Sequence, residues 1–214
     1  MDNQQYRDLI YHLTYLESMT EFICDNVELQ KMGGGGGDKE CPICGSKFHV
    51  YLPFGEHVRP NAQCPKCYSL ERHRALWILM NNLKWYRPNV RVLHFAPEPI
   101  FYSLFSSRKD IDYMPVDLNP KAFGVKKVVD ITNIPFDDNT FDFIMCTHVL
   151  EHIPNDRRAI SELYRVLKSN GGIALINVPI FNIPKTFENP DYNTPELRSK
   201  YYGQFDHVRA YGLD

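Results

Sequence analysis

Hydrophobic and polar positions follow two different periods along the chain from residue 90 onward. Short apolar runs alternate there with stretches in which apolar residues recur at helical spacing. Strands that alternate with helices are typical of a parallel sheet covered by helices on both faces. We therefore predict an α/β fold. The runs expected to form its buried strands are Val90–Phe95, Tyr113–Asp117, Val125–Asp130, Phe141–Cys146 and Ile173–Ile180.

Helical spacing of apolar residues also predicts the helices. Residues 4–30 have this pattern, and we interpret them as a packing helix; capping a substrate or joining two copies into a homodimer are the alternatives. The next helix is expected to begin after an N-cap at Ser69, because a hydroxyl there can accept a backbone hydrogen bond. A third helix runs through Phe105. The fourth is Arg157–Lys168, which Asn170-Gly171-Gly172 is expected to stop.

Two stretches fit neither period. Gly33–Gly37 is a run of five glycines, which we interpret as a flexible linker. Residues 181–214 are rich in proline and aromatic residues and are expected to be irregular, and such long loops are usually functional or disordered. The expected parts are a helical segment (1–32), the glycine linker (33–37), a cysteine module (38–68) and a larger domain (69–214) that ends in the aromatic segment.

The cysteine module contains two CxxC pairs, Cys41-Pro-Ile-Cys44 and Cys64-Pro-Lys-Cys67. Two such pairs joined by a short loop can place four thiolates at the corners of a tetrahedron, the geometry that structural Zn²⁺ prefers. We expect a zinc ribbon in which all four ligand positions are filled, so that the metal is structural. The same ligands can hold iron, and two disulfides are the other alternative.

Length, composition and charge narrow the class of protein. The chain has 214 residues, of which 43% are hydrophobic and 23% charged, as in ordinary globular proteins. A formal net charge of −2 gives no electrostatic case for a polyanionic partner. We see no apolar run long enough to span a membrane and no signal-peptide pattern, so a cytoplasmic location is the default expectation.

Candidate chemistry gathers at the expected ends of the strands. Asp117 ends the second strand, and a carboxylate there can accept hydrogen bonds from both hydroxyls of a ribose. Asp130 ends the third strand, where a carboxylate suits the exocyclic amine of adenine. Together they describe a site shaped for adenosine. Either aspartate can instead cap a turn or a helix.

Residues 90–180 resemble the core of a class I S-adenosylmethionine-dependent methyltransferase of the methyltransferase-11-like group. The segments that carry the resemblance are Phe141–Ile153, Glu162–Lys168 and Gly171-Gly172. The cysteine module ahead of them, with Arg72-His73-Arg74 and Trp77, is similar to a subgroup of these enzymes. The resemblance implies a Rossmann-like methyltransferase sheet, an S-adenosylmethionine cofactor and catalysis of methyl transfer.

The resemblance also implies roles for matching positions. Asp117, with Leu118, is expected to bind the ribose hydroxyls, and Asp130, with Ile131, the adenine. Thr147 and His148 are expected to line the methionine side of the cofactor. His94, Ala96 and Glu98, in the turn after the first strand, complete the expected cofactor site.

The turn after the first strand departs from the family pattern. It contains His94-Phe95-Ala96-Pro97-Glu98-Pro99, without the family's glycines, which let the backbone approach the cofactor closely. Ala96 is the smallest available substitute. His94 stands where the family has an acidic residue, and we hypothesise that Glu98 replaces it by pairing with the cofactor's ammonium group. The alternative is that Glu98 only stabilises a helix N-terminus.

The C-terminal part is a second departure, because the family fold normally adds two strands after the fifth. Residues 181–214 do not have the pattern of two strands, so we expect those strands to be missing. The acceptor needs a general base if it is a hydroxyl or a protonated amine, and the candidate catalytic residues are His148, His152 and His207. Glu151 is a further candidate, which we interpret instead as a helix-start residue packing against the sheet. Cys146 is expected to be a core residue.

The leading hypothesis is a methyltransferase that acts on a small molecule or a surface-glycan intermediate. A zinc-ribbon protein that binds or modifies RNA is the first alternative. Residues 38–75 contain six Lys/Arg and four Asp/Glu, a balance of only +2, which speaks against a nucleic-acid surface. The second alternative is a catalytically inactive scaffold, which the missing glycines make credible.

Overall fold

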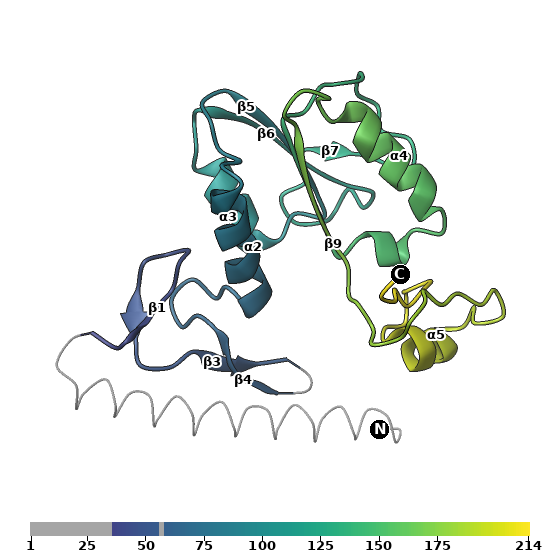
Figure 1. The fold of residues 1–214 in the computed structure, drawn as a ribbon, viewed down its shortest axis with the longest axis horizontal. Helices are drawn as coiled ribbons and strands as arrows, with labels where there is room; N and C mark the ends of the chain where they lie inside the picture. Colours follow the sequence, from purple (N-terminus) through teal and green to yellow (C-terminus); the bar gives the residue numbers. More distant parts are fainter. Residues whose placement is uncertain (1–35, 56–57) are drawn as a thin grey trace. The chain divides into compact units, whose positions relative to one another are not determined.

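The computed structural model describes residues 36–55 and 58–214 (Figure 1). Contacts divide the chain into two compact units, Met1–Lys84 and Trp85–Asp214, which are described separately below. The helix predicted over residues 4–30 and the linker residues 33–35 lie outside the described residues. The predicted domain limits remain predictions. The division by contacts assigns the helix that follows the cysteines to the first unit, whereas the prediction placed it in the larger domain.

The described part of the first unit contains two small hairpins and one helix. Strand β1 (Lys39–Glu40) pairs with β2 (Lys47–Phe48), and β3 (Leu52–Phe54) pairs with β4 (Arg59–Gln63), both antiparallel. Gly37 approaches the first hairpin so closely that a side chain there would collide with the Phe48 backbone, so this glycine is required by packing and is more than a linker residue.

Helix α2 (Glu71–Asn82) does not begin with the predicted Ser69 cap. Leu70 is the N-cap residue, and its backbone N–H donates to Nδ1 of His73, 3.0 Å away. The Ser69 hydroxyl is buried and lies 3.2 Å from Sγ of Cys67 and 3.5 Å from Sγ of Cys41. The cysteine cluster therefore takes the hydroxyl that the local sequence pattern assigned to the helix.

The second unit is built on a parallel sheet in the order β7-β6-β5-β8-β9. The chain forms the central strand first, adds two strands on one side, and then returns to add two on the other. The strands are β5 (Val90–Phe95), β6 (Ile111–Asp117), β7 (Lys127–Val128), β8 (Phe143–Thr147) and β9 (Ile173–Asn177). The predicted α/β fold with a Rossmann-like parallel sheet is confirmed.

Alternating side chains of the central strands serve two separate cores. Leu93 of β5 and Ile144 of β8 pack in one hydrophobic cluster with Leu163 of α4 (Asp156–Val166). His94, on the opposite face of β5, meets the aromatic rings of Phe101 and Phe105 of α3 (Pro99–Ser106) edge to face. Helices α3 and α4 therefore cover opposite faces of the sheet, as Figure 1 shows.

Several elements are shorter than the sequence pattern predicts, including β9, which ends at Asn177 and not at Ile180. Strand β7 has two residues, because only Lys127 and Val128 pair with β6 at the edge of the sheet. Helix α4 ends at Val166, since Leu167 is already extended and bridges to Phe141. Gly171 does adopt positive φ (+77°), so it serves the turn into β9 and does not cap the helix.

Residues after β9 are more ordered than predicted. They contain helix α5 (Pro195–Tyr202), which Thr194 caps by accepting from the backbone N–H of Leu197. Between β9 and Asp214 the described chain adds no further strand to the sheet, only the isolated bridges Ile180–Tyr211 and Phe187–Ala210. No helix within residues 36–55 and 58–214 is both long and apolar enough to cross a bilayer.

Candidate functional site

A pocket of about 420 Å³ opens at the carboxyl ends of β5, β6, β7 and β8. Strand order reverses between β5 and β8, and open α/β sheets bind ligands in the crevice beside such a reversal. A larger hollow of about 620 Å³ beside α3 and β6 receives none of the predicted site residues. The pocket is lined by Phe95, Ala96, Asp117, Leu118, Val129, Asp130, Ile131, His148, Val149, His152, Ile153 and Asp206.

The two aspartates predicted for adenosine both line this pocket. Asp117 accepts the backbone N–H of Asn119 through Oδ1 at 2.7 Å. Asp130 accepts both the backbone N–H and the hydroxyl of Thr132 through its own Oδ1, at 2.8 and 2.7 Å. Each carboxylate thus caps its turn, as the alternative interpretation held. Within the described residues, each keeps its Oδ2 available to a ligand.

The backbone is strained at two positions of the pocket wall. Ala96 has a φ of +47° and His148 a φ of +54°, in the left-handed region that favours glycine. Ala96 is held there by a backbone hydrogen bond to the carbonyl of Val116, 3.0 Å long. The turn after β5 therefore adopts a conformation suited to glycine although it contains none, and alanine adds only a methyl group at that point.

Three residues predicted for the cofactor site do not line the pocket. His94 is fully buried between α3 and β6, where Nδ1 lies 2.9 Å from the Tyr113 hydroxyl and burial lowers the pKa of the imidazole to about 3. Glu98 and Thr147 are joined at the ends of the neighbouring strands, the Thr147 hydroxyl donating to Oε2 of Glu98 at 3.0 Å. His94 therefore belongs to the core on the α3 side.

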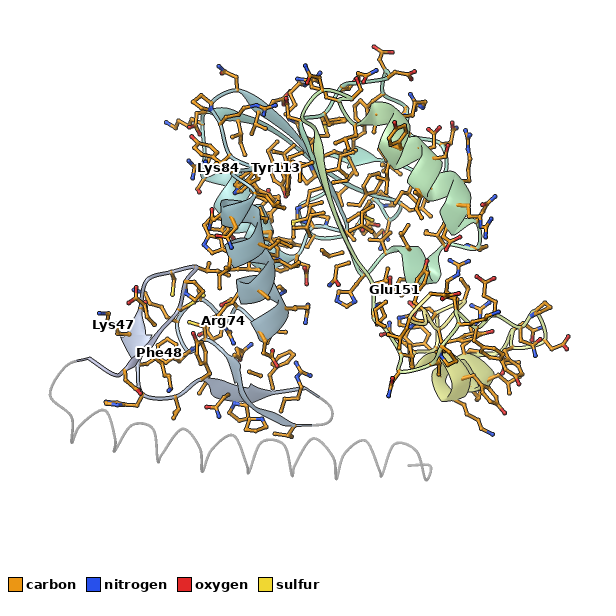
Figure 2. The ribbon with its side chains drawn as sticks, viewed as in Figure 1. Lys47, Phe48, Arg74, Lys84, Tyr113 and Glu151 are labelled. Atoms are coloured by element: carbon orange, nitrogen blue, oxygen red, sulfur yellow. The ribbon has the colours of Figure 1, made fainter. Side chains whose placement is uncertain are left out.

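A polar cluster follows β8, where the short 3₁₀ helix η1 (Leu150–His152) carries Glu151. Nδ1 of His148 lies 3.2 Å from Oε1 of Glu151, and Nε2 of His148 lies 3.5 Å from the side-chain amide of Asn177. Figure 2 labels Glu151 in η1, next to the C-terminal segment. The backbone carbonyl of Glu151 accepts from Val208, which ties the two segments together.

The three predicted catalytic histidines are close in space but differ in access. His148 and His152 line the pocket, whereas His207 is buried behind them and does not. The rings of His152 and His207 meet edge to face, with centroids 4.8 Å apart. Asp206 lies 3.3 Å from Nδ1 of His152.

Two arginine networks near the pocket were not predicted from the sequence. Arg165 of α4 donates to the carbonyls of Ile134 and Phe136 and pairs with the buried carboxylate of Glu162, which fixes the loop after Ile131. Arg209 is buried and donates to the carbonyls of Leu150 and Ile153, at the start of η1 and just after its end. The one local feature that could have indicated the second network is a charged residue, Arg209, within an aromatic-rich segment.

The four knuckle cysteines of the first unit form one cluster. Sγ of Cys41 lies 3.7 Å from that of Cys67, and Sγ of Cys44 lies 3.8 Å from that of Cys64. Four sulfurs around Zn²⁺, at about 2.3 Å each, stand about 3.8 Å apart, so the spacing fits the ion. All four are free thiols, not disulfides. Cys146 is buried in the sheet core, as expected, and burial raises its pKa to about 12.

Part of the second unit matches a known protein family. Residues 103–175 match the family model described as a methyltransferase domain, which includes the segments Phe141–Ile153 and Glu162–Lys168. This match supports the class I methyltransferase that the sequence resembles.

Curated relatives cover only part of the chain. An uncharacterized protein of Methanocaldococcus jannaschii is 37% identical over 102 residues, which cover 42% of this chain and 44% of that protein. Demethylmenaquinone methyltransferase of Listeria welshimeri is 39% identical over 51 residues, 24% of this chain and 22% of that protein. The chain thus spans less than half the length of these relatives.

Solved structures are also similar to the chain. The YcgJ protein of Bacillus subtilis has a TM-score of 0.48 at 22% identity, over 66% of this chain and 63% of that one. The trans-methyltransferase CalH in complex with SAH has a TM-score of 0.36 at 17% identity, over 46% of this chain and 34% of that one.

Proposed function

We propose that the chain, whose residues 103–175 match a methyltransferase domain, is an S-adenosylmethionine-dependent methyltransferase. The observation that carries this proposal is the pocket at the carboxyl ends of four adjacent parallel strands, with Asp117 and Asp130 in its wall. The free Oδ2 of Asp117 suits the ribose hydroxyls, and Asp130 beside the buried Ile131 suits the adenine.

Methyl transfer needs little covalent catalysis by the protein. When bound, the cofactor would supply a methyl group on a sulfonium, and transfer of that group to the acceptor would leave the sulfur as a neutral thioether. The acceptor must be aligned with the methyl group, and an acceptor that is a hydroxyl or a protonated amine must also lose its proton. His148, which lines the pocket and is oriented by Glu151, is the residue we propose as the base.

We propose an acceptor that is a small molecule or a surface-glycan intermediate. The partial relative from Listeria welshimeri acts, by its name, on demethylmenaquinone, which is consistent with a small acceptor. Glu98, joined to Thr147 near the same strand ends, is the residue we propose to meet the cofactor's ammonium group.

We further propose that Cys41, Cys44, Cys64 and Cys67 hold a structural Zn²⁺. Four thiolates leave no coordination position for substrate or water, so the ion would stabilise the first unit and take no part in methyl transfer. The Ser69 hydroxyl, within reach of two of the sulfurs, would orient them as an outer-sphere partner.

The test of the methyltransferase proposal is calorimetric binding of S-adenosylhomocysteine to Asp117→Asn. Asparagine keeps an Oδ1 that can accept from Asn119 but loses the charge and the second acceptor oxygen. We expect affinity to fall about 10- to 100-fold, since hydrogen bonds to charged groups contribute about 1.5–3 kcal/mol. Asp112→Asn, at the far end of the same strand and paired with Arg91, is the matched control and should bind normally.

Unchanged affinity in Asp117→Asn would contradict the assignment of the pocket. No binding to the unaltered chain at millimolar cofactor would favour the inactive scaffold. RNA affinity that falls steeply with salt would instead favour the nucleic-acid alternative.

A further inference from the structure

A cluster of two histidines and one carboxylate lies between η1 and the C-terminal segment. One ligand atom from each of Glu151, His152 and His207 lies within 4.8 Å of the others. Glu151 and His152 are adjacent in η1, whereas His207 comes from the C-terminal segment, held there by the hydrogen bond from Val208 to the Glu151 carbonyl. The fold thus assembles three side chains with metal-binding chemistry.

The hydrogen bonds of His207 leave one nitrogen available. Its Nδ1 lies 3.0 Å from the backbone carbonyl of Tyr202, which can only accept, so Nδ1 carries the proton. Nε2 is then the unprotonated nitrogen, with a lone pair that can bind a ligand. Histidines that bind metals usually donate the other ring N–H in this way to a carbonyl or carboxylate.

The same arrangement holds for His152. Its Nδ1 lies 3.3 Å from Oδ2 of Asp206, a carboxylate that can accept a hydrogen bond from a protonated Nδ1. Nε2 is again the nitrogen left to bind a ligand. Two neighbouring histidines are therefore both held by their Nδ1 atoms, one by a carbonyl and one by a carboxylate.

Glu151 supplies the third ligand group, and one of its carboxylate oxygens lacks a hydrogen-bond partner in the described structure. The side chain is 1% exposed, and Oε1 is engaged by His148. Oε2 is buried and has no hydrogen-bond partner in the described structure. Neither Lys nor Arg forms an ion pair with Glu151 among the described residues. A buried carboxylate oxygen without a partner is costly, and a bound cation would satisfy it.

We propose that Glu151, His152 and His207 bind a divalent transition-metal ion through Oε2 and the two Nε2 atoms. Two imidazoles and one carboxylate suit Zn²⁺, Fe²⁺ or Mn²⁺ and leave at least one coordination position open. Ligand atoms about 2.0–2.2 Å from an ion stand about 3.3 Å apart, so binding would draw the cluster together by about 1 Å. His152 and Asp206 also line the pocket, so the ion would lie beside the proposed methyl acceptor.

Zinc stoichiometry of the full chain tests this site separately from the cysteine cluster. We expect two Zn²⁺ per chain after dialysis against buffered zinc, counted by elemental analysis. Glu151→Gln and His207→Gln should each retain one ion and bind the second at least 100-fold more weakly, because each loses a direct ligand. Glu196→Gln, the same change at an exposed position of α5, is the matched control and should retain both. Cys41→Ser with Cys44→Ser should lose only the other ion.

Asp206→Asn tests the site even if the ligand variants fail to fold, because Asp206 is 41% exposed and is not itself a ligand. It should keep the fold, judged by circular dichroism, and weaken the second ion about 10- to 100-fold. One zinc per chain that disappears in the cysteine variant would overturn the proposal. So would a second ion that Glu151→Gln, His207→Gln and Asp206→Asn all bind as tightly as the unaltered chain. Neither result depends on methyl transfer or cofactor binding.

Discussion

Single residues of the second unit are used in ways that their local sequence does not reveal. His94 and His148 lie at the ends of adjacent strands, yet His94 faces α3 and is fully buried, whereas His148 lines the pocket. Ala96 takes a backbone conformation that glycine would adopt more easily. In each case the face of the strand, or the turn that follows it, decides the role.

His94 predicts an acid sensitivity of the second unit. Burial lowers its pKa to about 3, whereas an unfolded histidine titrates near 6.5. Below pH 6.5 the unfolded chain therefore binds a proton that the folded chain does not, so the contribution to stability is complete above that pH and is lost on acidification. We expect a loss of up to about 1.4 kcal/mol per pH unit from this residue.

Urea denaturation between pH 7 and 5, followed by fluorescence of Trp85 in a Trp77→Phe background, measures this slope. The double variant His94→Phe/Tyr113→Phe replaces the hydrogen-bonded pair by apolar rings. It should flatten the dependence of the unfolding free energy on pH. An equal slope in this variant would show that other groups cause the acid sensitivity.

At the scale of elements, Arg209 makes several of the contacts that join the C-terminal segment to η1 and α4. Arg209 donates to the carbonyls of Leu150, Ile153 and Pro154, and it pairs with Glu188 and Asp156. These contacts hold the segment against η1, so the position of His207 beside His152 depends on them.

Replacing Arg209 should therefore release this segment. Each buried carbonyl left without a donor costs about 1–3 kcal/mol, so we expect Arg209→Gln to lower the free energy of unfolding by at least about 2 kcal/mol. Limited proteolysis should then cleave within residues 181–214 faster than in the unaltered chain. Arg157→Gln, an exposed arginine of α4, should have little effect. Equal cleavage rates in the two variants would contradict the anchoring role.

At the scale of the whole molecule, the chain forms two compact units with different sources of stability. The second unit has a sheet with a hydrophobic core on each face. The first has, in its described part, short hairpins and a small cluster of Cys41, Phe48 and Cys64. So few buried apolar residues rarely stabilise a small module, and a bound metal commonly makes up the difference.

Chelation of zinc should therefore unfold the cysteine module. Trp77 reports on it directly, because its indole N–H donates to the carbonyl of Pro42 between two cysteines, at 2.9 Å. We expect a chelator to abolish the thermal transition seen by Trp77 fluorescence, and acidification to do the same as the thiolates are protonated. A Trp77→Phe chain, which keeps Trp85, serves as the control for signal from the second unit. An unchanged melting temperature of the module after metal removal would contradict this prediction.

The sequence by itself determined the features that depend on neighbours along the chain. Apolar runs predicted the strand Val90–Phe95 to the residue and the other strands to within a few positions, because period and burial are local patterns. Strand-end position likewise predicted Asp117 and Asp130, since carboxyl ends of parallel strands share one edge. The cysteine spacing predicted their cluster.

Only the tertiary structure decided what depends on contacts between distant segments. The Ser69 hydroxyl serves the cysteines and not its helix, and helix α4 ends where Leu167 joins the sheet edge. The meeting of Glu151 with His207 requires the C-terminal segment to fold back on η1, and no local pattern encodes that return. Burial and unmet hydrogen bonds, which mark Glu151 as a ligand, exist only once the segments are packed together.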